Sequence, residues 1–149
     1  MASITALKTG NWNDSTVWPG GTFPGASDDV FSGGFTVTIN QDITVLSLNA
    51  NGGGFTVSAA PRSITANIVS GTTTCLTCTH STGTVSVTGN ATGGSGSSAH
   101  GAYNNAGGSL NITGNATGGI GTNAYGANNN VSGTLNITGN ATGDRKSVV

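Results

Sequence analysis

Two cysteines and a histidine are the closest approach in the sequence to a metal-binding or redox motif. Cys75 and Cys78 are separated by two residues, and His80 follows two positions later. A zinc site needs four ligands, and the one other histidine, His100, stands where Tyr125 stands in the next repeat. Residues three apart in an extended strand point to opposite sides, which suits a chelate poorly. We therefore expect no metal site, one buried thiol with the other at a corner, and His100 as a surface or corner substitution.

Carboxylates are the other candidates for chemistry, and they gather near the N-terminus as Asp14, Asp28, Asp29 and Asp42. Cleavage of a glycosidic bond uses two carboxylates at a fixed separation in a groove. These aspartates instead lie among turn signals, where Asp commonly forms turns. Asp28 and Asp29 could hold a Ca²⁺ ion, but the glycine-rich calcium repeat is absent. We predict no catalytic residue, no cofactor and no enzymatic activity.

Charge is scarce throughout the chain. Charged residues make up 6% of the 149 residues, and the formal net charge is -1. Binding to nucleic-acid phosphates takes clusters of Lys and Arg, so a nucleic-acid partner is excluded. No apolar run approaches the length of a membrane span, roughly 18 residues or more. The first residues also lack the basic and apolar regions of a secretory signal.

A repeat supplies the elements that position these residues. The segments at 85–94 (VSVTGNATGG), 110–119 (LNITGNATGG) and 135–143 (LNITGNATG) start 25 residues apart, and the residues between them also align. Each repeat holds one alternating strand with apolar residues at Leu110 and Ile112, followed by glycine corners and a weaker strand or turn near 124–127. We interpret one repeat as one coil of a parallel β-solenoid, of either hand. A β-sandwich is the alternative.

Stacked repeats predict columns of identical side chains. Val87, Ile112 and Ile137 should lie over one another inside the solenoid. A second column should contain Asn90, Asn115 and Asn140, whose side-chain amides would form hydrogen bonds along the solenoid axis.

The remaining segments divide the chain into four regions. Alternating strands at 35–39, 43–48, 55–58, 64–69 and 76–79 predict irregular first coils over 35–84, ahead of the regular repeats at 85–143. Residues 1–34 hold both tryptophans, Trp12 and Trp18, and we predict that they form a cap. Open solenoid ends expose unpaired strands, so an aromatic-rich plug is expected there. An aromatic sugar-binding platform is the alternative for these two rings.

The cap and coils resemble known proteins. The pattern TGNW-x5-W-x-GG-x2-P-x3-DD-V followed by a TVTI strand resembles the start of β-helical proteins of phage virions and bacterial surfaces, including the G8-type domain. The TGNATGG coils look like repeats of tail-fibre and adhesin-like chains. The resemblance implies a parallel β-helix that serves as a shaft or binding surface, often within a multimer.

The last six residues, 144–149 (DRKSVV), break the repeat with three charged residues. We interpret them as an artefactual tail translated from a sequencing adapter. A charged stop that guards the solenoid edge is the alternative.

The sequence thus predicts a non-enzymatic structural or recognition protein, a fragment of a phage tail fibre or other virion appendage. A bacterial cell-surface adhesin is the alternative, and the N-terminal part of a polysaccharide depolymerase is a third possibility. The expected partners are host-surface glycans, identical chains in a homotrimer and other virion proteins. The expected location is the virion after synthesis in the host cytoplasm, or the cell surface for an adhesin.

Overall fold

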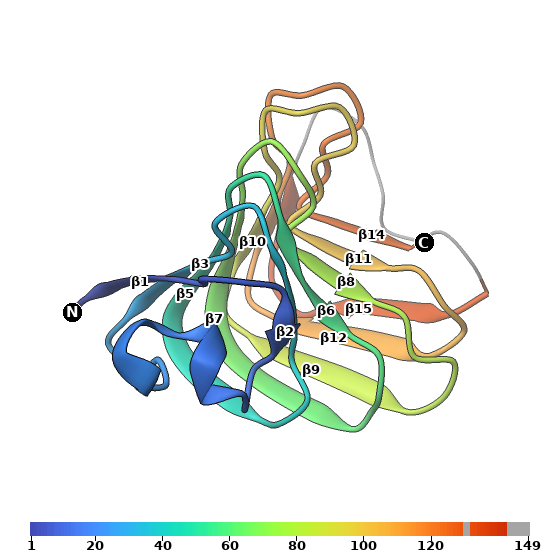
Figure 1. Cartoon of the computed structure of the whole chain (residues 1–149). Coiled ribbons are helices and arrows are strands. Elements are labelled where there is room, and N and C mark those ends of the chain that lie inside the picture. Colours follow the sequence, from blue (N-terminus) through green and yellow to red (C-terminus); the bar gives the residue numbers. More distant parts are fainter. Residues whose placement is uncertain (130–131, 143–149) are drawn as a thin grey trace.

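The computed structural model describes residues 1–129 and 132–142, and it is a parallel β-solenoid (Figure 1). Every strand pairs in parallel with strands of the coils before or after it. The alternation of Thr with Val, Ile and Leu explains this arrangement, since one side of each strand faces the interior and the other faces solvent. The predicted all-β solenoid class is confirmed.

Within these ranges the strands form two sheets. The first contains β1 (Ser3–Thr5), β3 (Asp29–Phe31), β5 (Ile43–Ala50), β7 (Arg62–Ser70), β9 (Thr84–Thr88), β10 (Ala91–Thr92), β12 (Ser109–Thr113), β13 (Ala116–Thr117), β15 (Thr134–Ile137) and β16 (Ala141–Thr142). The second contains β2 (Gly10–Asn11), β4 (Thr36–Thr38), β6 (Gly54–Val57), β8 (Leu76–Cys78), β11 (Ala102–Asn104) and β14 (Ala127–Asn129). The cap adds two short 3₁₀ helices, η1 (Ser15–Val17) and η2 (Pro19–Gly21).

The regular coils have three sides. One coil runs through β9, β10 and β11, and the next through β12, β13 and β14. The first half of β7 pairs with β9 and its second half with β10, so the first sheet bends between two sides. Gly89 and Gly114 occupy this bend with φ of 147° and 156°. A Cβ at Gly114 would collide with the carbonyl oxygen of Gly89, so glycine is required there by both conformation and space.

The interior is built from columns of apolar side chains. Ile112 lies in register between Val87 and Ile137, and the column continues upstream through Ile64 to Ile43. Val87 and Ile112 are fully buried, whereas Ile137 in β15 is half-buried. The column therefore forms the dry core of the solenoid wherever a coil lies on both sides of it.

The coils widen along the chain at one corner. Register advances by 18 residues from Thr38 to Thr56 but by 25 residues from Asn104 to Asn129. Most of this difference lies in the connection that leads from the first sheet to the second sheet. In four successive coils this connection covers residues 51–53, 71–75, 93–101 and 118–126, so it lengthens along the chain. Figure 1 shows these loops as a stack of growing height. We call the last two the corner loops.

The corner loops stack because glycine lets their backbones approach closely. A Cβ at Gly119 would collide with the carbonyl oxygen of Gly94 in the preceding loop. The amide of Gly121 donates to the same oxygen at 3.1 Å. Gly119 therefore gives the space for this close approach.

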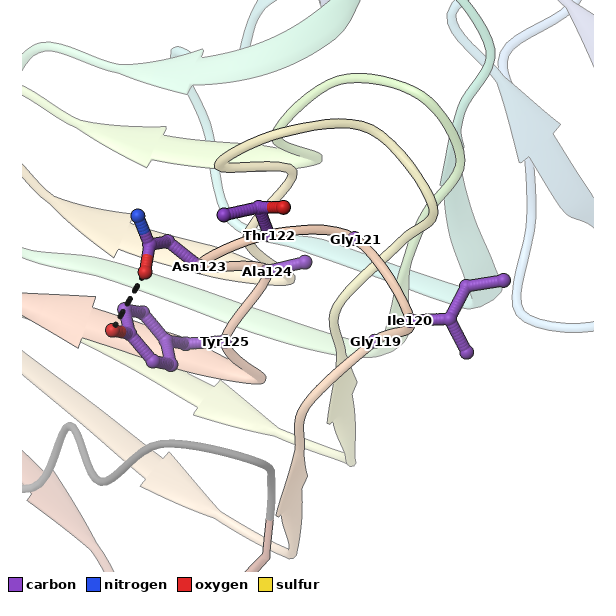
Figure 2. Close-up of a pocket in the computed structure, with 7 residues that line it drawn as sticks. All are labelled: Gly119, Ile120, Gly121, Thr122, Asn123, Ala124 and Tyr125. Carbon is purple, nitrogen blue, oxygen red and sulfur yellow. Dashed lines mark hydrogen bonds between the residues drawn. The ribbon is translucent and has the colours of Figure 1, made fainter.

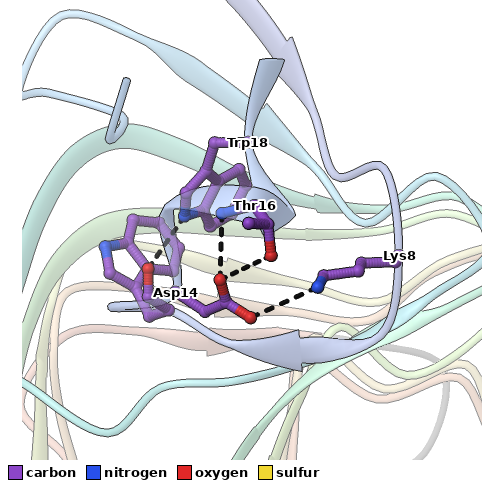
Figure 3. Close-up of polar contacts among 5 residues, drawn as sticks. Lys8, Asp14, Thr16 and Trp18 are labelled. Atoms are coloured by element: carbon purple, nitrogen blue, oxygen red, sulfur yellow. Dashed lines mark hydrogen bonds and ion pairs between the residues drawn. The ribbon is translucent and has the colours of Figure 1, made fainter. Parts of the chain in front are cut away.

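Residues 1–34, the predicted cap, contribute strands to both sheets of the solenoid, because β1 pairs with β3 and β2 with β4. Trp12 and Trp18 are each 1% exposed and meet edge to face, with ring centroids 4.8 Å apart. The indole N–H of Trp18 donates to the carbonyl oxygen of Trp12 at 2.8 Å (Figure 3). Asp14 caps η1 by accepting from the amide and hydroxyl of Thr16, and it pairs with Lys8 at 3.4 Å. Both indoles pack inside the cap, which leaves no exposed tryptophan face for a sugar-binding platform.

The predicted tail at 144–149 lies outside the described residues. In the ranges that the structure covers, no helix has the length and apolar character needed to cross a membrane.

Candidate functional site

Cys75 and Cys78 both lie inside the solenoid. Cys75 lies in the corner connection 71–75, as expected for one of the two thiols, but it is buried there just as Cys78 is buried in β8. The Cys75 thiol donates to the carbonyl oxygen of Leu48 at 3.2 Å. Burial raises the pKa of both thiols to about 12. They therefore act as small apolar core side chains and not as nucleophiles.

His80 is also buried, at the turn that follows β8. Its Nε2 lies 3.2 Å from the carbonyl oxygen of Ser109 and must carry the proton, since a carbonyl only accepts. A Cβ at Gly108 would collide with the imidazole ring, so glycine makes room for it. Over residues 1–129 and 132–142, no three His, Cys, Asp or Glu side chains gather into a group that could hold a metal ion.

Asp28 and Asp29 are engaged in holding the cap together. Asp28 accepts from the amides of Ala2 and Gly25, both at 3.0 Å. These two hydrogen bonds, first that of Gly25 and then that of Ala2, lower the pKa of the Asp28 carboxyl. Asp29 accepts from the hydroxyl of Ser47 in the next coil. The two carboxylates thus stabilise separate contacts of the N-terminal coil.

A pocket of about 400 Å³ opens where the corner loops meet the second sheet. Residues from three successive coils line it: Thr74, Ser98, His100, Tyr103, Asn123, Tyr125 and Asn128. Parallel stacking brings them together, because β8, β11 and β14 are neighbours in the second sheet. We call this the corner pocket. Its lining combines aromatic rings with amides and hydroxyls and carries no charged side chain.

His100 anchors the wall of the corner pocket. It is 5% exposed, and its ring stacks on that of Tyr125 with centroids 5.4 Å apart and planes within 2°. Its Nδ1 accepts from the backbone amide of Tyr125 at 3.3 Å, so a neutral ring carries its proton on Nε2. The side-chain nitrogen Nδ2 of Asn128 lies 3.0 Å from that Nε2. Burial lowers the pKa of His100 and favours this neutral form.

His100 therefore lies at a corner, as expected, but it is buried and not at the surface. It joins two coils through a ring stack and a hydrogen bond to Tyr125. The contact between His100 and Tyr125 was not predicted from the sequence.

Tyr103 projects outward from β11 into the corner pocket. Its strand neighbours Ala102 and Asn104 are buried, whereas Tyr103 is half-buried. The ring lies 5.2 Å from that of His100, with the planes inclined at 42°. Thr77 and Asn128 flank it in register on the adjacent coils. Tyr103 thus stands as an aromatic platform between shorter polar side chains.

The pocket falls where the repeats differ. The pairs that stack across its two corner-loop coils are Ser98 with Asn123, His100 with Tyr125, and Tyr103 with Asn128. Their backbones remain equivalent, since Ser98 and Asn123 have φ of 56° and 57°. By contrast, the strand segment at 110–113 and its successor at 135–138 are identical. The repeats also differ at Ser95 with Ile120 and at Ser97 with Thr122, which do not line the corner pocket, so the variation follows the corner loops as a whole.

The second corner loop also encloses a smaller hollow of about 300 Å³, lined by residues 119–125 (Figure 2). The hydroxyl of Tyr125 donates to the side-chain oxygen of Asn123 across its mouth at 3.5 Å. Ile120 projects away from the loop and is 95% exposed. This hollow is formed by a single loop, whereas the corner pocket draws on three coils.

Away from the pocket, the outer surface carries columns of uncharged side chains. Thr44, Thr65, Thr88 and Thr113 follow one another in register and are all exposed. We call this column the threonine ladder. Its hydroxyls repeat at the interval between paired strands, about 4.8 Å. The ladder forms a flat polar face on a different side of the solenoid from the corner pocket.

The asparagine column forms a hydrogen-bonded ladder along the axis. The backbone amide of Asn115 donates to the side-chain oxygen of Asn90, and that of Asn140 to the side-chain oxygen of Asn115, both at 2.9 Å. Asn67 extends the ladder upstream by accepting from the amide of Asn90 at 3.1 Å. The donors of these three bonds are backbone amides, so the ladder ties side chains to the corner backbone of the next coil. The side-chain nitrogen of Asn90 also donates to the side-chain oxygen of Asn67, at 3.4 Å.

Comparisons of the chain with protein-family models, with curated proteins and with solved structures find no match. The class of protein that the structure defines is thus the β-solenoid, and the case for a function depends on the surfaces described above.

Proposed function

We propose that this chain is a non-enzymatic structural and recognition protein, a segment of a phage tail fibre or similar virion appendage. In this proposal the solenoid is a stiff shaft, and its corner contacts glycans on a host surface. The observation that carries the proposal is the corner pocket, where aromatic, amide and hydroxyl side chains from three successive coils meet.

The stacked architecture supports the shaft role. Each regular coil is tied to the next by backbone pairing on three sides, by the asparagine ladder and by the buried isoleucine column. Such a solenoid is quasi-one-dimensional, so it can extend by adding further coils of the regular 25-residue kind. A stiff rod of this kind holds a contact surface away from the body of a particle.

The state of the acidic residues supports a non-enzymatic role. Asp28 and Asp29 accept hydrogen bonds within the cap, Asp14 pairs with Lys8, and Asp42 accepts from the amide of Ser63. The lining of the corner pocket contains none of these carboxylates. General acid and base catalysis on a sugar needs a carboxylate within reach of the scissile bond.

The proposal is tested by adding the fluorescently labelled full chain to a panel of bacterial cells and to their purified surface polysaccharides. We expect retention on a subset of the panel with no release of reducing sugar. Release of sugar overturns the non-enzymatic role, and failure to bind any member of the panel overturns the recognition role.

The virion assignment needs a separate measurement. Peptides of this chain in purified virus particles support the appendage, whereas peptides in washed cell envelopes support the bacterial adhesin instead. Sedimentation of the pure chain tests the proposed homotrimer, since a monomer mass at high concentration contradicts it.

A further inference from the structure

We infer that the corner pocket binds a neutral pyranose sugar, with the apolar C–H face of the sugar packed on the ring of Tyr103. The inference rests on the proposed recognition function and names its site and its ligand class.

Tyr103 supplies the stacking surface. It projects outward from β11 between the shorter side chains of Thr77 and Asn128, so its ring stands above its neighbours on the sheet. His100 supports the ring from one side at 5.2 Å and is itself held by its stack on Tyr125. The face of an aromatic ring carries partial negative charge, which attracts the polarised C–H groups of a sugar. A supported ring loses little conformational freedom when a ligand binds.

Polar groups surround this platform at fixed places. The hydroxyl of Thr74 donates to the carbonyl oxygen of Ser98 at 3.0 Å, which ties the loop to the preceding coil. Asn123, one coil further on, is exposed and receives the hydroxyl of Tyr125 on its side-chain oxygen. An amide both donates and accepts, and each sugar hydroxyl does the same, so the two match in pairs. Aromatic lining with a few convergent polar groups is the usual composition of a small-ligand site.

The lack of charge selects neutral sugars. Among the described residues the cationic side chains are Lys8, which pairs with Asp14 in the cap, and Arg62, which donates to the carbonyl oxygen of Pro61. Neither lines the corner pocket. A sugar acid or sugar phosphate would lose hydration there with no cation to compensate it. Burial also keeps His100 neutral at pH 7, so it supplies no positive charge.

A single pocket of this kind should bind with a Kd on the order of millimolar, and several copies on an assembled shaft would bind a surface far more tightly. The test is therefore ligand-observed and protein-observed NMR with the full chain, which detects weak binding. The probes are methyl glycosides of glucose, galactose, mannose and N-acetylglucosamine, compared with glucuronic acid and N-acetylneuraminic acid. Backbone amide shifts locate the site.

Three variants sharpen the test. Tyr103→Ala removes the platform and should weaken neutral-sugar binding about tenfold or more, which corresponds to about 1.4 kcal/mol. Tyr103→Phe keeps the ring and should retain most of the affinity. Thr113→Ala, on the threonine ladder, is the matched control and should bind like wild type. Backbone amide spectra of each variant show whether the fold is kept, and Tyr103→Phe keeps the inference testable if Tyr103→Ala unfolds.

The outcomes separate this inference from the proposed function. Neutral-sugar shifts confined to 98–103 and 123–128 support it, provided that they weaken in Tyr103→Ala or, if that variant unfolds, persist in Tyr103→Phe. The inference is overturned if Thr113→Ala weakens sugar binding and Tyr103→Ala does not. It is also overturned if the chain prefers the acidic sugars. In both cases the recognition function itself stands. Binding to cells without binding to any neutral probe also overturns it. Binding to neither cells nor sugars overturns both.

Discussion

Replacing Ile112 by alanine should be among the most damaging single changes to the solenoid. Ile112 is fully buried and lies in register between Val87 and Ile137. The change removes three carbon atoms, which contribute about 0.8 kcal/mol each, or about 2.4 kcal/mol of lost burial. The cavity left between the two neighbouring coils adds to this loss, because Ile→Ala costs about 2 to 5 kcal/mol in protein cores. We expect a decrease of about 3 to 4 kcal/mol in the free energy of unfolding.

Urea denaturation followed by far-ultraviolet circular dichroism measures this loss as a lower midpoint at an unchanged slope. Thr113→Ala is the matched control, because Thr113 is the exposed neighbour on the same strand and should change stability by no more than about 0.5 kcal/mol. Ile137→Ala should fall between the two, since Ile137 is half-buried. Equal midpoints for Ile112→Ala and Thr113→Ala would refute the stacked column on which the fold depends.

Three further predictions concern other contacts. Burial lowers the pKa of His100 in the folded protein. The stability that this side chain contributes is therefore present above its unfolded pKa of about 6.5 and is lost as the pH falls through its lower folded value. The urea midpoint should drop more between pH 7.5 and pH 5 in wild type than in His100→Gln, and equal drops would contradict this. Cys75 and Cys78 have a pKa of about 12, so neither thiol should react with a thiol reagent at pH 8 until urea unfolds the chain. Rapid labelling of the native protein would contradict this, because it would show that a thiol is accessible. Asn115→Ala removes the side-chain oxygen that accepts from the backbone amide of Asn140. It should lower the free energy of unfolding by about 1 kcal/mol in the same urea assay. An unchanged midpoint would mean that water replaces this hydrogen bond without loss.

The 25-residue repeat predicted most of the architecture, because identical segments of successive repeats pair with one another in neighbouring coils. Two identical LNIT segments must occupy equivalent places in successive coils, and β12 and β15 pair residue for residue. The irregular strands were also found by alternation alone, since the predicted strand at 64–69 lies within β7. In β7 inward and outward positions alternate, so local pattern and tertiary structure agree there, whereas the register of β5 shifts between Thr44 and Ser47.

The alternation of apolar and polar residues predicted less of the structure at positions where the chain bends. A weaker strand or turn is expected near 124–127, and the structure has the end of the corner loop there, with β14 beginning at Ala127. Cys75 faces inward because the chain bends at this residue, directly before β8, which cancels the alternation. The role of His100 depends on a ring in the next coil, a contact 25 positions away that composition and local periodicity do not report.

The graded length of the corner has an evolutionary consequence. Between the early and late coils the connection grows from 51–53 to 118–126, yet the parallel strands on the three sides keep their pairing. Insertions there are absorbed outside the packed prism, as in other solenoids whose per-repeat insertions gather on one face. Selection can therefore diversify this edge without destabilising the rod. The same edge is the natural place for an engineer to graft a foreign binding loop.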